Sequence, residues 1–266
     1  MICLNMIVRN ESKNIERLLN SVAPIVNSYC ICDTGSTDNT IELITKFALE
    51  HEWIGKVVEQ PFVNFEVSRN YALKEARTLN PDYILLMDAD MVLVIEDFDV
   101  SKLKNPAYCL KQNSGSLIYD NVRLVSGKEN VWYKGVTHEY LDIRGDTLEG
   151  IWIQDIGDGG SKSNKFERDI KLLEQGLIDE PNSDRYMFYL ANSYADNNNY
   201  EKAVDMYKKR IAFGGWDEET FYCHLRMGQC YKQLKQYESM IKTWLDGWNY
   251  RPSRIETLYE LMVYLS

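Results

Sequence analysis

Residues 82–90 of the chain read DYILLMDAD, an apolar run that ends in two carboxylates. Such a run is typical of a buried strand, which holds its backbone rigidly while Asp88 and Asp90 emerge at its carboxyl end. In an open α/β sheet, ligands bind outside that end of the strands. Two carboxylates there suit Mg²⁺ or Mn²⁺ bridging a diphosphate, because these ions take their remaining ligands from phosphate and water. The alternative is a solvated turn at the strand end, because the Asp-x-Asp pattern alone is weakly specific.

The sequence around this strand alternates short apolar runs with amphipathic stretches up to about residue 160. This alternation predicts right-handed crossovers and a mainly parallel sheet covered on both faces by helices. After residue 88 the pattern changes to extended segments with turns, which predicts an irregular, mixed sheet for binding the acceptor. The expected strands are residues 2–8, 29–33, 55–60 and 82–88, the expected helices 12–22, 38–50 and 66–79, and the later extended segments 107–112, 116–125, 131–136 and 148–155.

The remainder of the chain has helical spacing and an internal repeat. The pattern Leu190-Ala191-x-x-Tyr194 recurs as Met227-Gly228-x-x-Tyr231, 37 residues later, in the small-residue and aromatic spacing of a tetratricopeptide helix pair. Two and a half such repeats are marginal alone, so we expect this module to pack against the first domain. The predicted domains are residues 1–165, α/β, and 166–266, all-α.

Composition excludes several classes of function. The 266 residues include 40 acidic and 30 basic side chains, a formal net charge of −10, which disfavours binding to nucleic acid or to anionic membranes. The sequence has neither an apolar run of transmembrane length nor the features of a secretory signal. Its six cysteines form no C-x-x-C pair, so we expect reduced, mostly buried thiols in a cytoplasmic protein.

Further polar residues follow the other expected strands. Residues 33–40, DTGSTDNT, contain cap-type residues that open a helix, but a capped turn leaves Asp33 unexplained. A carboxylate that ends a buried strand needs a donor, such as a base N–H or a ribose hydroxyl. Arg9 and Glu11 follow the first strand at the same edge of the sheet, and Arg69 supplies a cation near a helix start, where it can bind phosphate.

The blocks MIVRNESKNIERLLNSV (6–22), DTGSTDNT (33–40), FVNFEVSRNYAL (62–73) and DYILLMDADMVL (82–93) resemble, in this order and spacing, a family 2 glycosyltransferase. The resemblance covers roughly residues 1–160 and implies the GT-A fold, the Rossmann-like mixed sheet of nucleotide-diphospho-sugar transferases. The tail, with GGWDEETFY (214–222), resembles the tetratricopeptide-like extension of a subgroup of these enzymes.

The resemblance also implies roles for individual residues. It assigns the base to Asp33, the ribose region to Glu11, the base or phosphate to Arg69, the ribose to Asp88 and the metal to Asp90. Further nucleotide contacts are expected from Arg9, Ala89 and Lys165, and further metal contacts from Asp88, Asp155 and His138.

Thr137-His138-Glu139 matches a His-Glu block of relatives, and Glu139 is the candidate general base, because an inverting transfer needs a carboxylate that deprotonates the acceptor hydroxyl. Relatives often carry a metal-binding His after the last strand, where this sequence has Asp155. Asp158 is the second candidate for the catalytic acid or base. Together with Lys162 and Lys165 it lies on a Gly-rich segment that could close over the diphosphate, although a solvated loop explains these residues equally well.

The sequence therefore predicts a glycosyltransferase that uses Mn²⁺ or Mg²⁺ and a UDP-sugar such as UDP-glucose or UDP-GlcNAc, with inversion implied by the resemblance. The acceptor, a glycan, lipid or peptide, is left open, and the helical repeats could bind a protein partner. A nucleotidyltransferase is the alternative among enzymes, but the basic loop expected for triphosphate cleavage is missing. The alternative outside enzymes is a non-catalytic scaffold that combines nucleotide binding with helical repeats.

Overall fold

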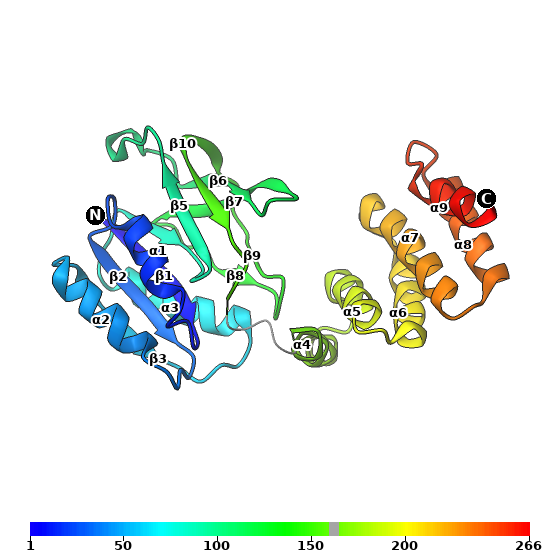
Figure 1. Cartoon of the computed structure of the whole chain (residues 1–266), viewed down its shortest axis with the longest axis horizontal. Helices are drawn as coiled ribbons and strands as arrows, with labels where there is room; N and C mark the ends of the chain where they lie inside the picture. The colour runs from blue at the N-terminus through cyan, green and yellow to red at the C-terminus, as the bar shows by residue number, and fades with distance from the viewer. Residues whose placement is uncertain (160–164) are drawn as a thin grey trace. The chain divides into compact units, whose positions relative to one another are not determined.

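The structure, a computed structural model, describes residues 1–159 and 165–266 (Figure 1). The chain divides into two compact units, Met1–Ser163 and Asn164–Ser266. Each unit has its own architecture and is described by itself.

The first unit is a mixed α/β structure. Its described residues form an eight-stranded sheet in the order β3-β2-β1-β4-β7-β6-β10-β5, and a two-stranded sheet of β8 and β9. The strands are β1 (Ile2–Val8), β2 (Ser28–Asp33), β3 (Ile54–Glu59), β4 (Tyr83–Leu86), β5 (Met91–Ile95), β6 (Ala107–Asn113), β7 (Ile118–Ser126), β8 (Tyr133–Lys134), β9 (Tyr140–Leu141) and β10 (Asp146–Asp155). The helices are α1 (Ile15–Val22), α2 (Thr40–Glu50), α3 (Phe65–Arg77) and the 3₁₀ turn η1 (Val100–Lys102).

Strand direction separates the two halves of the sheet. Strands β1 to β4 pair in parallel, as predicted, so that their carboxyl ends meet at one edge. Strand β7 pairs antiparallel with both β4 and β6, and β10 pairs parallel with β6 but antiparallel with β5. The ends of β6 and β10 therefore lie at the same edge as the ends of β1 to β4.

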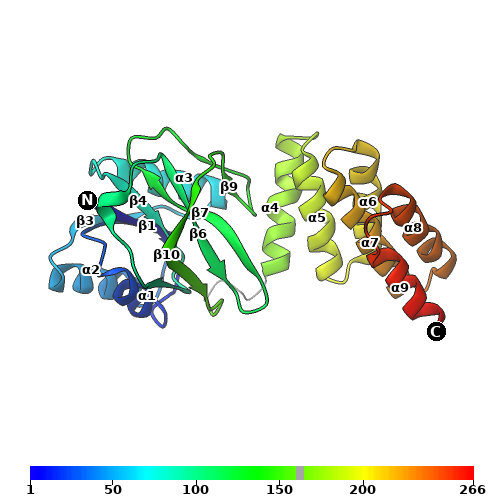
Figure 2. The same ribbon diagram turned by 90° about the horizontal axis from the view of Figure 1, so that it is seen from above.

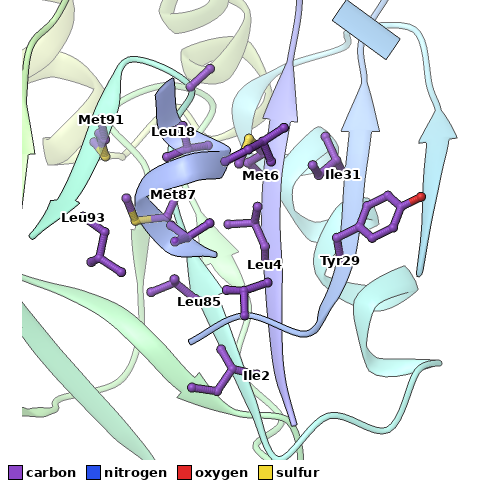
Figure 3. Packing of buried hydrophobic residues seen from close by; sticks show 14 of the residues in the cluster. Ile2, Leu4, Met6, Leu18, Tyr29, Ile31, Leu85, Met87, Met91 and Leu93 are labelled. Carbon is purple, nitrogen blue, oxygen red and sulfur yellow. The ribbon is translucent and has the colours of Figure 1, made fainter. Parts of the chain in front are cut away.

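The sheet is covered on both faces, as the alternation of strands and helices predicts. Along β1, Leu4 and Met6 belong to the apolar cluster that includes Leu18 of α1, whereas Cys3 points to the opposite face and packs with Leu73 of α3. Figure 3 shows the first of these clusters, with residues of β1, β2 and β4 gathered beside α1. Burial of these alternating positions fixes the register of the parallel strands and, with it, the strand ends that carry the polar residues.

All six cysteines are free thiols, as expected; five are buried and Cys109 is partly exposed. Burial raises the pKa of Cys3 to about 12, so this thiol is protonated and unreactive at neutral pH. Among the described residues, no helix is both long and apolar enough to cross a membrane.

The second unit consists of helices that pack in succession (Figure 2). Their bounds are α4 (Lys165–Asp179), α5 (Asp184–Asp196), α6 (Tyr200–Phe213), α7 (Asp217–Gln233), α8 (Tyr237–Tyr250) and α9 (Glu256–Leu265). The predicted repeat is present, because α5 packs with α6 and α7 packs with α8, and α9 packs against α8. Helix α4, which packs against α5, precedes the repeat and is not part of the predicted pattern.

Small residues allow the close packing of these helices. A Cβ atom added at Gly228 of α7 would lie 2.1 Å from Nε1 of Trp244, a fully buried side chain of α8. The tetratricopeptide-like spacing of small and aromatic residues therefore has a direct steric cause.

Candidate functional site

Polar side chains gather at the edge where the parallel strands end. Asp33 is the last residue of β2, Glu11 lies just beyond β1, and Asp88 follows β4. The turn that contains Asp88 leads through Asp90 directly into β5. The candidate site is therefore built on short turns that follow buried strands, which position side chains more precisely than long loops do.

Asp33 lies in a tight turn in which only one of its two carboxylate oxygens accepts hydrogen bonds. Oδ2 accepts hydrogen bonds from the backbone N–H groups of Gly35 at 2.9 Å and Ser36 at 2.8 Å. Gly35 has a φ of 110°, a left-handed conformation that favours glycine. The other oxygen, Oδ1, is buried and has no hydrogen-bond partner among the described residues, although Asp33 is only 2% exposed. A buried acceptor without a donor is costly, so this oxygen is suited to an N–H group of a ligand.

The two residues expected from the first strand end lie at the same edge. Glu11 is buried, its Oε2 accepts a hydrogen bond from Asn14 at 3.1 Å, and its backbone N–H donates to Oγ1 of Thr40 at 2.8 Å. These contacts tie the turn after β1 to the start of α2. The side chain of Arg9 is exposed beside this turn.

Asp88 is held by two arginines. Arg69 of α3 donates from Nη2 to Oδ1 at 2.6 Å, and Arg123 of β7 donates from Nη1 to Oδ2 at 3.3 Å. Burial alone would raise the pKa of Asp88, but the two guanidinium groups outweigh it and lower the pKa to about 2. Asp88 is therefore a charged anchor in the site at every physiological pH.

Arg69 also connects this anchor to Glu139. Its Nε donates to Oε1 of Glu139 at 2.6 Å, and its guanidinium lies 5.6 Å from the ring centre of Tyr133. Arg69 reaches both acids because Asn64 caps α3, accepting from the N–H of Val67 at 2.8 Å, which places Arg69 in the second turn of the helix. The candidate base and the strand-end acid, far apart in sequence, are thus joined through one side chain.

Arg123 extends the contacts in the other direction. Its Nη2 and Nε donate to Oε1 of Gln112 at 2.9 and 3.2 Å, and Nε2 of Gln112 donates to Oδ2 of Asp155 at 2.9 Å. Arg123 and Gln112 are not among the site residues expected from the sequence. The available signal was a lone arginine within the apolar run VRLV (122–125), which matches an ordinary solvent-facing position of a strand.

The result is a continuous polar chain across the site, in the order Glu139, Arg69, Asp88, Arg123, Gln112 and Asp155.

Asp90 lies beside this chain. Burial, together with the negative charges of Asp88 and Asp155, raises the pKa of Asp90. Its Oδ2 accepts from the backbone N–H of Gly159 at 3.3 Å. Ala89, between the two acids, is buried and brings its backbone rather than a functional group to the site. The carboxylate of Asp90 therefore lies close to two other negative charges, those of Asp88 and Asp155.

The donor set fits a divalent cation at Asp90 and Asp155. Four carboxylates, those of Asp88, Asp90, Glu139 and Asp155, meet two guanidinium groups, so two negative charges stay uncompensated within this group. Carboxylate oxygens are the ligands that Mg²⁺ and Mn²⁺ prefer. A cation bound there would complete its coordination with ligand oxygens and water.

The larger ligand set expected from the sequence is not assembled. Within residues 1–159 and 165–266, no three His, Cys, Asp or Glu side chains gather closely enough to hold an ion by themselves. Both oxygens of Asp88 bind arginines in this structure. The exposed His138, at φ 52°, lies on the turn that carries Glu139.

The described residues after β10 place the candidates of this segment as follows. Asp158 forms a two-bond ion pair with Arg17 of α1, at 2.7 and 2.9 Å, which engages both of its carboxylate oxygens. Lys165 begins α4 in the second unit instead of lying on a glycine-rich loop, and Lys162 lies outside the described residues. Of the two acid or base candidates, only Glu139 belongs to the polar chain.

An open α/β sheet with acids at its strand ends, followed by helical pairs, is the architecture of the GT-A fold with a tetratricopeptide-like extension. The chain belongs to glycosyl transferase family 2, whose model matches residues 3–147.

Two curated relatives illustrate this membership. The prophage-derived glycosyltransferase SunS of Bacillus subtilis is 26% identical over 231 residues, which cover 79% of this chain and 53% of that protein. The poly-beta-1,6-N-acetyl-D-glucosamine synthase of Staphylococcus epidermidis is 30% identical over 152 residues, 51% of this chain and 32% of that protein. The chain thus spans about half the length of SunS.

A solved structure shows the same fold. The crystal structure of TarS from S. aureus matches with a TM-score of 0.52 and 13% identity, over 91% of this chain and 55% of that one.

Proposed function

We propose that the chain transfers a sugar from a UDP-sugar to an acceptor hydroxyl, in a reaction that depends on Mn²⁺ or Mg²⁺ and inverts the anomeric carbon. The observation that carries this proposal is the Glu139–Arg69–Asp88 connection, with Arg69 within 2.6 Å of both acids. It joins a candidate base to the strand end that carries Asp90. A nucleotide-binding scaffold has no need of such a connection.

The nucleoside would lie at the ends of β1 and β2. The free Oδ1 of Asp33 would accept the N3–H group of uracil, which is the reason for proposing uridine. Glu11 and Asp88 would face the ribose, and Arg9, the residue after β1, would meet the phosphates.

The cation would bind Asp90 and Asp155. When bound, it would neutralise charge on the diphosphate as that group leaves. Glu139 would accept the proton of the acceptor hydroxyl, while Arg69 keeps its carboxylate oriented. Asp158 would hold the loop after β10 against α1 through Arg17.

The sugar and the acceptor require a direct test. The name of the staphylococcal relative makes UDP-GlcNAc a rational first donor, followed by UDP-glucose. We expect slow hydrolysis of one of these donors with Mn²⁺ and none with EDTA. Asp90→Asn should abolish hydrolysis, whereas Asp97→Asn, an exposed carboxylate just beyond the far end of β5, should not. Nucleotide binding without turnover of any donor, in Mn²⁺ or Mg²⁺, would instead support the scaffold.

A further inference from the structure

Gln112 is a buried amide placed between two charged groups of opposite sign. It lies near the end of β6, between β7 and β10, and is only 2% exposed. Arg123 lies on one side of the amide and Asp155 on the other.

The contacts determine which way the amide faces. A guanidinium group has only donors, so the atom of Gln112 that faces Arg123 must be the oxygen. The amide nitrogen is then directed at Oδ2 of Asp155, 2.9 Å away. Arg123 thereby sets the direction in which Gln112 donates, and the donated bond fixes the carboxylate of Asp155.

Strand pairing brings this carboxylate to Asp90. Asp155 is directly opposite Met91 in the antiparallel pairing of β10 with β5, and Met91 is the residue after Asp90. The next residue, Ile156, donates its N–H to the carbonyl oxygen of Asp90 at 3.2 Å. The two carboxylates are neighbours because of the backbone, but backbone pairing does not decide how the side chain of Asp155 is turned.

We propose that Gln112, held in one orientation by Arg123, is the positioning residue that turns Asp155 toward a divalent cation shared with Asp90. This inference rests on the proposed function. Outer partners that orient the ligands of a metal change its affinity by about 10–100-fold when they are removed. Gln112 has the contacts of such a partner, since one end is anchored and the other holds a candidate ligand.

The test compares metal binding with nucleotide binding in the same variants. Gln112→Met keeps the length of the side chain but loses both of its hydrogen-bonding functions. Calorimetric titration of Mn²⁺ into protein saturated with UDP should show an affinity about 10–100-fold weaker than that of the wild type. UDP affinity in EDTA should stay within about twofold, because Asp33 and Glu11 do not depend on Gln112 and Asp88 keeps its 2.6 Å hydrogen bond to Arg69. The control is Lys111→Met, an exposed residue of the same strand.

Arg123→Lys tests the direction of the connection. A lysine keeps the charge near Asp88 but cannot also hold Gln112 with two N–H groups, so Mn²⁺ affinity should fall here too. Arg123 acts on Asp155 through Gln112. The double variant Gln112→Met/Arg123→Lys should therefore have the same Mn²⁺ affinity as whichever single variant binds Mn²⁺ more weakly.

Three results would overturn the inference. Mn²⁺ affinity of Gln112→Met within about twofold of the wild type would remove the positioning role. An equal loss of UDP binding in EDTA would show a merely structural role, and additive losses in the double variant would refute the connection. If the wild type saturated with UDP binds no Mn²⁺, the proposed metal dependence is wrong as well. If the wild type binds Mn²⁺ and Gln112→Met binds it equally well, only the positioning role of Gln112 is wrong.

Discussion

Replacing Asp33 by asparagine changes one atom in the proposed nucleoside site. The turn should persist, because the remaining side-chain oxygen can still accept from the N–H groups of Gly35 and Ser36. The amide nitrogen then replaces Oδ1, the buried oxygen without a partner. An acceptor thus becomes a donor at the position where we expect the N3–H group of uracil.

The size of the effect follows from the bond that is lost. A hydrogen bond to a charged group contributes about 1.5–3 kcal/mol. Since about 1.4 kcal/mol corresponds to a tenfold change, the Kd for UDP should rise by roughly 10–150-fold. Cytosine has an acceptor at N3, so Asp33→Asn should also reduce the preference for UDP over CDP.

Isothermal titration with UDP and CDP measures both effects, and a thermal melt confirms that the variant is folded. Asp97→Asn makes the same change of charge at an exposed position and should bind UDP like the wild type. UDP affinity of Asp33→Asn within about twofold of the wild type would refute the assignment of Asp33 to the base.

Three further predictions concern the catalytic base, the charged anchor and the helical unit. Glu139→Gln should retain UDP and Mn²⁺ binding but reduce sugar transfer by roughly 10²–10⁴-fold in a product assay; full activity would exclude it as the base. The pKa of Asp88 in the folded protein is lowered to about 2, so the ion pairs of Asp88 stabilise the fold at pH values above its unfolded pKa. In urea unfolding, the wild type should be more stable than Asp88→Asn by about 2 kcal/mol at neutral pH. This difference should be lost as the pH falls from about 4 to 2. Gly228→Ala forces a methyl group against Trp244 and should destabilise the helical unit by about 1–3 kcal/mol in thermal melts; an unchanged melting temperature would contradict the close contact.

The parts of the fold that depend on local pattern could be predicted from the sequence. The apolar run before Asp88 and the cap-type residues after Asp33 mark strand ends, and parallel pairing brings such ends together. The repeat was visible because its small and aromatic residues recur at a fixed interval. These signals come from residues that are close in sequence or periodic.

The contacts between distant strands could not be predicted in the same way. Gln112 and Asp155 are 43 positions apart, and only the pairing of β6 with β10 makes them neighbours. The sequence also does not show that Arg69 and Arg123 engage both oxygens of Asp88. The number of partners that an acid already has is a property of tertiary structure.

The alternation of charge along the polar chain limits how this site can change during evolution. Loss of Asp88 would leave Arg123, whose side chain is 10% exposed, without its counter-charge, which costs more than the original pair contributes. Arg69 is 12% exposed and serves two acids, so the loss of Glu139 leaves it paired with Asp88 but alters the electrostatic environment of Asp88. Drift away from activity is therefore easiest by substitutions that remove opposite charges together, and inactive descendants of this chain should show paired replacements rather than isolated ones.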